Sequence, residues 1–517
     1  MKEIKVLWID DEIEMLKPHI LFLEEKNYRI TTSSNGNDGI KLVEENNFDI
    51  VLLDEMMPGL DGLETLTEIK KLNETLPIVM VTKNEEEGLM NKAISHQISD
   101  YIIKPINPNQ VLMSLKKIVM SEEIRRERTG EEYAKFSAWY NRKMFTQPEL
   151  EDLFEIFLSF VEWDIKLDNL NYDDLLQIHS YERKNFNSEF SNFIKSNYVN
   201  FVQENKYAMS HNIVEKYVIP KISKKKPTYF IVLDCLRADQ LLAIRPYLEE
   251  LFNVDISYYL SILPTSTPYA RNAIFAGMLP KNIAKRFPQY WQGDDSPETS
   301  RNRYEHFLVD DLMKRKNVSL PKGSKYTKIL NQEEGEYVTK KIPSYKNERF
   351  IVLVYNFLDM LLHHRFKDEV LREMLPNDRA LRSLTKIWFL NSNLYKSLKL
   401  IAKQDATVFI TTDHGSIKVE HASKVISDKK ATPGLRSKHG RNVSCDENHA
   451  MRINDLGKIG IPAAGLVDSF IFAKGDYYFV YPTDYNEYKK KFHGTYQHGG
   501  ISMDEMILPI ATLTTKK

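Results

Sequence analysis

The sequence predicts an α/β protein in three sections: a doubly wound domain at 1–120, an all-helical domain at 121–220 and an α/β sandwich at 221–517. Three observations lead to this division. Up to about residue 119, short apolar runs alternate with amphipathic stretches of helix length, which is typical of a parallel sheet with crossover helices. The alternation then stops, and no glycine occurs between Gly130 and Pro220. Strand-like apolar runs return at Tyr229.

Composition places the chain among ordinary globular proteins. A net charge of -1 gives no reason to expect a nucleic-acid or membrane surface. Two cysteines form no disulfide framework, which favours a reducing compartment. The longest apolar run, Phe350–Leu362, is interrupted by polar residues and is too short to span a bilayer. We therefore expect a cytoplasmic protein without a membrane span.

Five apolar runs in the first section lead into polar side chains. The runs are Lys5–Ile9, Tyr28–Thr32, Ile50–Leu53, Ile78–Val81 and Tyr101–Ile103. Asp10 and Asp11 follow the first run, Asp54 the third, Thr82 the fourth and Lys104 the fifth. Because parallel strands end at one edge of their sheet, these side chains should converge. Three carboxylates there favour Mg²⁺, and an aspartate can accept a phosphoryl group whose oxygens a lysine neutralises.

These residues, with Pro58, Gly62 and Pro105, resemble the CheY-like receiver domain of bacterial response regulators over about residues 3 to 119. The resemblance implies that a sensor histidine kinase phosphorylates Asp54 while Asp10, Asp11 and Asp54 hold Mg²⁺. It implies that Thr82 and Lys104 contact the phosphoryl group, with Lys104 preceding a cis proline. Tyr101 matches the aromatic residue that turns inward on activation. Phosphorylation should then produce a homodimer.

The second section has helical spacing throughout. Leu150–Phe160 shows it most clearly, and Glu122–Arg128 continues a receiver-linked helix with charge pairs three and four residues apart. Aromatic residues such as Phe157 and Trp163 are expected in a helix-bundle core. The section either transmits a signal or serves as a rigid spacer. Lys221–Lys226 is a basic linker to the third section.

Polar residues also follow strand-like runs in the third section. Asp359 and His363 are four residues apart, so on a helical turn they share one face and can bind one metal ion. Together the candidates offer three carboxylates, three imidazoles and a hydroxyl, which suit two zinc ions with a nucleophile between them. They are Asp234, Thr267, Asp359, His363, Asp413, His414 and His498.

Thr267 is the candidate nucleophile. It lies between two prolines and leads into an apolar helix predicted at 270–278. Zinc could make its hydroxyl an alkoxide near neutral pH, and two zinc ions could stabilise the attacking and leaving oxygens of a displacement at phosphorus. Helix amides beyond Thr267, with Arg271, could stabilise the remaining phosphoryl oxygens.

The order of these motifs resembles the alkaline phosphatase superfamily, in its PglZ-type branch, over about residues 227 to 512. The resemblance assigns one zinc to Asp234, Thr267, Asp413 and His414 and the other to Asp359, His363 and His498. It places the superfamily's last strand in 500–509. The zinc core is similar to nucleotide pyrophosphatases, which favours a nucleotide-type phosphodiester. Their amide ligand has no counterpart at Ala270, and Asn272, two residues later, is the candidate substrate-binding amide together with Arg271.

The whole arrangement resembles the PorX family of response regulators, which is linked to type IX secretion. It implies a phosphorylation-controlled dizinc phosphodiesterase. The alternative is an adaptor with a structural or vestigial zinc site that binds a sigma factor or a secretion component. Direct DNA binding is not expected, because no helix-turn-helix pattern or basic domain occurs.

Several other basic residues are candidate ligands. Arg436, Lys438 and Arg441 could contact a substrate phosphate, although a solvated loop is the commoner arrangement. Five further histidines lack a carboxylate at a metal-binding spacing and are expected in the core or on the surface. They are His364, His421, His439, His449 and His493.

Overall fold

The computed structural model describes residues 3–83, 98–168, 170, 172–291, 302–427, 434–440, 443–462, 469–483 and 485–516. The chain divides into two compact units, Met1–Phe145 and Thr146–Lys517. Within the described residues, no helix combines the length and the apolar character that a membrane crossing requires.

The first unit is built on a five-stranded parallel sheet in the order β2-β1-β3-β4-β5. Its strands are β1 (Ile4–Ile9), β2 (Tyr28–Ser33), β3 (Ile50–Asp54), β4 (Ile78–Thr82) and β5 (Asp100–Ile103). These bounds agree with the predicted runs to within two residues. Buried apolar residues lie on both sheet faces, so the doubly wound prediction is confirmed.

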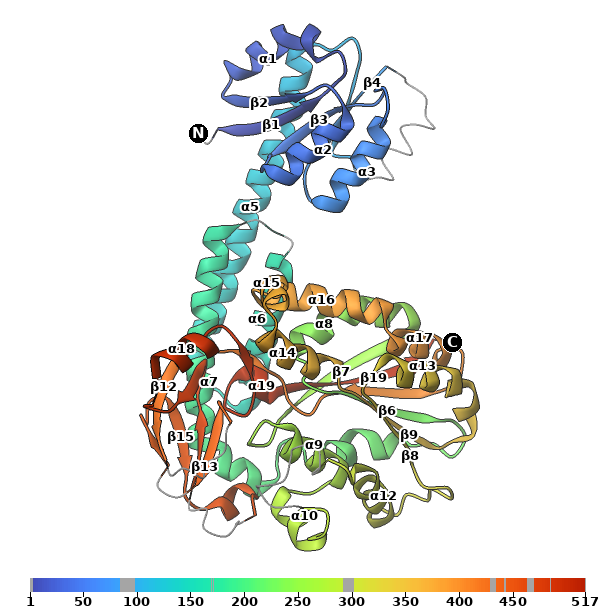
Figure 1. Cartoon of the computed structure of the whole chain (residues 1–517), viewed down its shortest axis with the longest axis vertical. Coiled ribbons are helices and arrows are strands. Elements are labelled where there is room, and N and C mark those ends of the chain that lie inside the picture. Colours follow the sequence, from blue (N-terminus) through green and yellow to red (C-terminus); the bar gives the residue numbers. More distant parts are fainter. Residues whose placement is uncertain are drawn as a thin grey trace. The chain divides into compact units, whose positions relative to one another are not determined.

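Helices cover both faces of this sheet (Figure 1). They are α1 (Lys17–Glu24), α2 (Gly36–Glu45), α3 (Gly62–Leu72) and α5 (Pro108–Phe145), with a 3₁₀ turn at Ile13–Leu16. Residues of α1 and α5 share a core with one face, and α3 shares a core with the other. Helix α5 continues without a break for 38 residues, well beyond the core that it shares with the sheet.

The second unit contains a six-stranded mixed sheet in the order β7-β19-β10-β6-β9-β8. Strand β19 runs in the opposite direction to the other five strands. The strands are β6 (Thr228–Leu233), β7 (Phe252–Leu260), β8 (Lys325–Ile329), β9 (Phe350–Tyr355), β10 (Thr407–Thr411) and β19 (Ile507–Thr515). Strands β6, β9 and β10 coincide with predicted runs, and apolar clusters on both faces make this the α/β sandwich that the sequence predicts.

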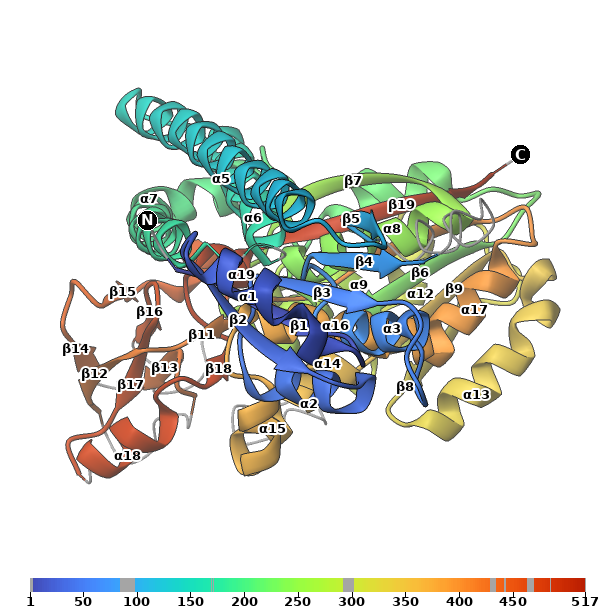
Figure 2. The same cartoon turned by 90° about the horizontal axis from the view of Figure 1, so that it is seen from above.

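Helices flank this sheet on both sides in two views (Figures 1 and 2). One face packs against α8 (Ala238–Leu251), α13 (Gln332–Lys341), α16 (Asp378–Asn391) and α17 (Asn393–Ile401). The other packs against α9 (Thr267–Ala276), α10 (Pro280–Arg286) and α12 (Glu305–Arg315). Helix α14 (Phe357–Lys367) follows β9, and α15 (Glu369–Met374) follows α14.

Short strands form three smaller sheets in the C-terminal part of this unit. They are β11 (Ile417–Lys418), β12 (His421–Ile426), β13 (Ser437–Gly440), β14 (Ser444–Cys445), β15 (Ala450–Ile453), β16 (Ser469–Ala473), β17 (Tyr477–Val480) and β18 (Tyr496–Gln497). Helix α18 (Tyr485–Phe492) precedes β18, and α19 (Met503–Met506) precedes β19.

Two long helices, α6 (Leu150–Asp168) and α7 (Asp173–Glu204), precede a π turn at Val214–Val218, and with it they form the start of the second unit. They confirm the predicted helical middle.

Two predicted boundaries in the second unit differ from the structure. The last strand begins at Ile507, because Ser502 caps a helical turn by accepting a hydrogen bond from the Glu505 amide. Helix α9 begins at Thr267, three residues before the predicted start, because Pro268 is compatible with a first helical turn.

Candidate functional site

The first unit brings Asp10, Asp11 and Asp54 together at the carboxyl ends of β1 and β3, with one ligand atom from each within 4.8 Å of the others. The Lys104 ammonium nitrogen lies 3.1 Å from Asp10 Oδ2 and 3.0 Å from Asp54 Oδ1. Thr82 is buried at the end of the neighbouring strand, and Tyr101 is 41% exposed. The Lys104-Pro105 peptide bond is cis, as the resemblance implies.

Burial, followed by the charge of Asp10, raises the pKa of Asp54 to about 6, while Lys104 opposes this shift. One lysine therefore does not fully compensate the clustered carboxylates. A hard divalent cation would supply the missing positive charge, so the residues fit Mg²⁺.

Replacing Asp54 by asparagine should stabilise the magnesium-free protein at pH 7.5. The folded pKa of Asp54 lies above its unfolded value of 3.8, so ionisation of the wild-type carboxyl disfavours folding as pH rises from about 4 to 6. The variant should gain about 2–3 kcal/mol in the free energy of unfolding of the first unit. Urea unfolding at pH 7.5 and pH 4 checks this, with Glu44→Gln on α2 as a surface control. A gain of equal size at both pH values would contradict it.

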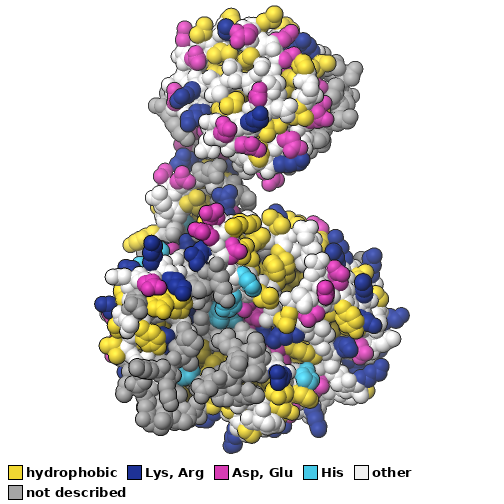
Figure 3. Space-filling view, viewed as in Figure 1, with side chains coloured by type: hydrophobic (Ala, Val, Ile, Leu, Met, Phe, Trp, Pro, Cys, Tyr) yellow, Lys and Arg dark blue, Asp and Glu magenta, His cyan; other side chains and the backbone are white. Residues whose placement is uncertain are grey.

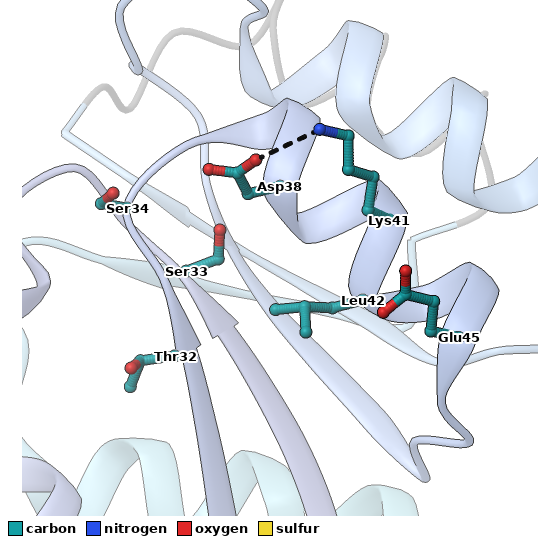
Figure 4. Close-up of a pocket in the computed structure, with 7 residues that line it drawn as sticks. All are labelled: Thr32, Ser33, Ser34, Asp38, Lys41, Leu42 and Glu45. Carbon is teal, nitrogen blue, oxygen red and sulfur yellow. Dashed lines mark ion pairs between the residues drawn. The ribbon is translucent and has the colours of Figure 1, made fainter.

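A surface pocket lies elsewhere in the first unit, beside the end of β2 and along α2 (Figure 4). Its lining residues are Thr32, Ser33, Ser34, Asp38, Lys41, Leu42 and Glu45. None of them belongs to the acidic cluster, and Lys41 pairs with Asp38 across 3.7 Å.

In the second unit, Asp234 follows β6, Asp413 and His414 follow β10, and Thr267 occupies the first turn of α9. Asp234, Asp413 and His414 are fully buried and form one candidate metal group. Thr267 Oγ1 lies 3.0 Å from His414 Nε2 and 3.4 Å from Asp234 Oδ1. The predicted nucleophile therefore borders this group.

The buried Asp413 carboxylate has one oxygen without a hydrogen-bond partner in the described part of the chain. Asp413 Oδ1 accepts bonds from the amides of Cys235 and His414, whereas Oδ2 accepts none. Burial and the nearby charge of Asp234 raise the pKa of Asp413. An orphaned buried carboxylate oxygen is costly unless a cation binds it, so this group fits a metal ion.

His414 presents a nitrogen suited to metal binding. Its Nδ1 lies 3.1 Å from the Gly415 carbonyl oxygen, to which it can donate, and this leaves the Nε2 lone pair facing Thr267. Burial and the neighbouring His498 lower the pKa of His414, which favours the neutral form that binds metals.

Asp359, His363 and His498 form a second candidate metal group. Asp359 Oδ1 lies 3.4 Å from His363 Nε2 and 3.8 Å from His498 Nε2. Burial alone would raise the pKa of Asp359, but its contacts with His363 and His498 outweigh burial and lower it. The His498 ring stacks on His414 at a centroid distance of 4.1 Å, so the two groups adjoin. The His363 side chain is 63% exposed, and Figure 3 shows histidine side chains at the surface of this unit.

Arg271, a predicted substrate contact, lies behind the first group. Its Nη1 donates to Asp234 Oδ2 at 2.6 Å, and its Nε donates to Glu305 Oε1 at 2.7 Å. Glu305 also accepts from the Asn302 side-chain amide at 2.7 Å and from the Tyr326 hydroxyl. Asn272, the residue after Arg271, is also buried, and its side-chain amide donates to the Pro268 carbonyl at 2.9 Å.

Glu305, Asn302 and Tyr326 were missed by sequence reasoning. No spacing pattern links them to Asp234. The sole available clue was that a buried arginine needs carboxylate partners.

The turn after Asp234 has an unusual backbone. Cys235 is buried and adopts a left-handed conformation with φ of 65°. This places the Cys235 and Leu236 amides on Asp413 Oδ1 and Thr412 Oγ1, at 3.4 and 3.0 Å. The strain of a non-glycine residue in this region is thus offset by contacts that join the ends of β6 and β10.

Gly415 leaves no room for a side chain beside His414. A Cβ atom there would lie 1.9 Å from the Asp504 carbonyl oxygen. Gly415→Ala should therefore move the loop, lower the free energy of unfolding by about 2–4 kcal/mol and weaken metal binding by the candidate ligands. Thermal unfolding and metal analysis check this. Gly130→Ala is the matched control, because a Cβ at Gly130 in α5 meets nothing within 4 Å. Unchanged unfolding and unchanged metal content in Gly415→Ala would contradict it.

The prediction that Arg436 and Lys438 lie in a solvated loop is wrong. Both side chains are buried beside or on β13. The Arg436 guanidinium binds the buried Glu505 carboxylate, with Nε 3.2 Å from Oε1, and the Lys438 ammonium lies over the Tyr481 ring at 4.4 Å. Sequence reasoning missed the partners because Glu505 lies 69 residues away. Arg441 lies outside the described residues.

The five further histidines considered as ligands, His364, His421, His439, His449 and His493, belong to none of the three metal groups found among the described residues. His439 is buried and stacks on Phe470 at a centroid distance of 4.5 Å. His421 Nδ1 lies 2.8 Å from Asp476 Oδ1.

Comparison with protein families gives three matches along the chain. The model of the BREX system PglZ alkaline phosphatase-like domain matches residues 213–513, more than half of the 517 residues. The chain belongs to the PglZ alkaline phosphatase-like family. A response regulator receiver domain precedes the PglZ domain at residues 6–116, and a PorX response regulator linker domain lies between them at residues 123–202.

Individual relatives match the receiver domain of this PglZ-family protein. The transcriptional regulatory protein ResD of Bacillus subtilis is 37% identical over 117 residues, which are 23% of this chain and 48% of ResD. SrrA of Staphylococcus aureus is 32% identical over 22% of this chain and 47% of SrrA. The chain thus spans about half the length of these relatives.

Solved structures match the same region. The response regulator TrrA of Thermotoga maritima, solved with Mg²⁺ and beryllium fluoride, is 30% identical and covers 23% of this chain and 99% of its own, with a TM-score of 0.21. A receiver domain protein of Methanospirillum hungatei is 26% identical and covers 23% of this chain and 97% of its own, with a TM-score of 0.22.

Proposed function

We propose that the PglZ domain is a dizinc phosphodiesterase whose activity is controlled by phosphorylation of the receiver domain at Asp54. The observation that carries this is the position of the Thr267 hydroxyl, 3.0 Å from His414 Nε2 and 3.4 Å from Asp234 Oδ1. A nucleophile beside one metal group, with a second group adjoining it, is an arrangement that supports in-line displacement at phosphorus.

Asp234, Thr267, Asp413 and His414 would hold one zinc ion, and Asp359, His363 and His498 the other. When bound, the zinc ions lower the pKa of the attacking hydroxyl and neutralise charge on the phosphoryl oxygens. Thr267 Oγ1 attacks phosphorus, forming the threonyl–phosphate ester as the bond to the leaving alcohol breaks. Water then hydrolyses this ester and restores the threonine.

Helix α9 supports the same step. Thr267 begins this ten-residue helix, Pro268 has no amide hydrogen, and the Tyr269 and Ala270 amides donate to the Ser266 carbonyl oxygen at 3.1 and 2.9 Å. Of the first-turn amides, that of Thr267 itself is therefore the one that we assign as a donor to a phosphoryl oxygen. Arg271 already donates to two carboxylates, so we assign it to positioning Asp234. With that arginine engaged, a substrate with a single negative charge is favoured, in keeping with a nucleotide-type phosphodiester.

Control by the receiver domain follows from the acidic cluster around Asp54. A sensor histidine kinase would supply the phosphoryl group, and Mg²⁺ held by Asp10, Asp11 and Asp54 would neutralise its charge. Thr82, Lys104 and Tyr101 would change arrangement upon phosphorylation and promote a homodimer. The PorX linker match supports a role in type IX secretion, with a sigma factor or a secretion component downstream.

Zinc content and hydrolysis of bis-p-nitrophenyl phosphate test the catalytic part. The purified protein should contain two zinc ions per chain and hydrolyse the diester faster than p-nitrophenyl phosphate. Chelation should abolish the activity, and added zinc should restore it. Bound zinc without turnover, with and without beryllofluoride, would favour the adaptor with a structural zinc site.

A further inference from the structure

Helix α7 lies against two loops of the candidate zinc centre, although it belongs to the segment that matches the PorX linker. We call residues 263–267, which end at Thr267, the nucleophile loop. The ligand loop, residues 498–504, begins with His498. Figure 1 shows α7 beside α19, which starts within the ligand loop, and residue contacts join the two helices.

Tyr198 connects α7 to the nucleophile loop. Its hydroxyl accepts a hydrogen bond from the Leu263 amide at 2.6 Å, and both residues are fully buried. Burial raises the pKa of Tyr198, so the hydroxyl remains neutral at physiological pH. Leu263 precedes Thr267 by four residues, and the bond therefore fixes the backbone at the start of this loop.

Three other residues of α7 connect it to the ligand loop. The Ser191 hydroxyl shares its hydrogen between the Ile501 carbonyl oxygen at 3.0 Å and the Asn187 carbonyl oxygen of its own helix at 2.8 Å. Asn187 Oδ1 accepts from the Met503 amide at 3.0 Å. Arg183 binds both carboxylate oxygens of Asp504, at 2.7 and 3.0 Å. Residues 183, 187 and 191 are four apart, so they form one stripe along the helix.

The two loops are also joined to each other. Thr265 Oγ1 donates to the Gly500 carbonyl and accepts from the Gly499 amide, each at 3.0 Å. His498 Nδ1 lies 3.2 Å from the Thr265 carbonyl oxygen. A displacement of either loop against α7 would therefore change the distance between Thr267 and the zinc ligands.

Helix α6 fixes α7 in turn. Asp164 of α6 accepts from Arg183 Nε at 2.9 Å and lies 2.8 Å from His179 Nε2, and all three side chains are largely buried. Arg183 thus joins α6, α7 and the ligand loop in one charged network.

We propose that the linker helix α7 is part of the zinc centre, with Tyr198, Ser191 and Asn187 acting as positioning residues for the nucleophile and ligand loops. The expected effect on kcat rests on the proposed phosphodiesterase activity. The expected ordering of the two loops rests on the hydrogen bonds alone. The alkaline phosphatase-like domain is accordingly incomplete without the linker.

Two variants of the full chain test this, Tyr198→Phe and the double variant Ser191→Ala with Asn187→Ala. Tyr181→Phe is the matched control, because Tyr181 lies on the same helix and is 68% exposed. The first readout is kcat and KM for bis-p-nitrophenyl phosphate with zinc content. In Tyr198→Phe, kcat should fall about 10-fold to 100-fold while KM and zinc content stay within about 2-fold of the control.

The second readout is hydrogen–deuterium exchange, which needs no activity. Peptides covering 263–267 should exchange faster in Tyr198→Phe. Peptides covering 498–504 should exchange faster in the double variant. The exchange of peptides from the six-stranded sheet should not change in either variant. Unchanged exchange in these peptides would overturn the proposal, as would an unchanged kcat in an active protein. If the wild type binds zinc but hydrolyses nothing, the proposed activity fails, and exchange alone decides the role of α7.

Discussion

Thr267→Ala should abolish phosphodiester hydrolysis while leaving both zinc ions bound. The hydroxyl is the group placed to attack phosphorus, because it lies 3.0 Å from His414 Nε2 and 3.4 Å from Asp234 Oδ1. Removing a nucleophile typically costs several orders of magnitude, so we expect a loss in kcat of about 10³-fold or more. Hydrolysis of bis-p-nitrophenyl phosphate with parallel zinc analysis measures it.

Ser266→Ala is the matched control for this variant. Ser266 is the neighbouring residue, it is also partly exposed, and its side chain makes no capping hydrogen bond to α9. The control should keep wild-type activity to within about 3-fold. A Thr267→Ala protein that retains activity with full zinc content would remove Thr267 from the mechanism.

Asp413→Asn should remove one zinc ion and reduce hydrolysis by about 10³-fold. Asp413 Oδ2 is a buried oxygen that accepts no hydrogen bond from the residues that the structure describes, and an amide in its place is a much weaker zinc ligand. The same change should stabilise the metal-free protein. Burial and Asp234 raise the pKa of Asp413, so the ionised carboxylate disfavours folding at neutral pH when zinc is absent.

Asp413→Asn should thus weaken zinc binding and stabilise the metal-free protein, and two measurements test this. Metal analysis should give one zinc ion per chain, and the rise in Tm caused by zinc should be smaller than in the wild type. Asp405→Asn is the control, because the Asp405 side chain is 81% exposed just before β10. Two zinc ions and an unchanged zinc-induced rise in Tm would show that Asp413 is not a ligand.

Much of the fold is predictable from the sequence because both sheets are largely parallel. Strands such as β6 and β10 are buried on both faces and read as continuous apolar runs, and their carboxyl ends carry Asp234 and Asp413. The same rule brings Asp10 near Asp54 in the first unit. Sequence spacing thus locates the residues that gather at a sheet edge.

The surroundings of the site follow no such rule. Arg271 faces Glu305 and Asp234 because α9 and α12 pack together, and this contact leaves no repeated spacing in the sequence. For the same reason Arg436 was expected in a solvated loop, although it forms a buried pair with Glu505. The hydrogen bonds of α7 to residues 263 and 501 join segments 65 and 310 residues apart.

We propose that phosphorylation of the receiver domain controls a zinc phosphodiesterase in the same chain. The most direct test is the rate of bis-p-nitrophenyl phosphate hydrolysis by the zinc-loaded protein, with and without Mg²⁺ and beryllofluoride, in the wild type and in Asp54→Ala. The wild-type rate should change by about 5-fold or more, together with a shift from monomer to dimer, and the variant should show neither response. Hydrolysis that is equal under all four conditions would contradict control by the receiver domain.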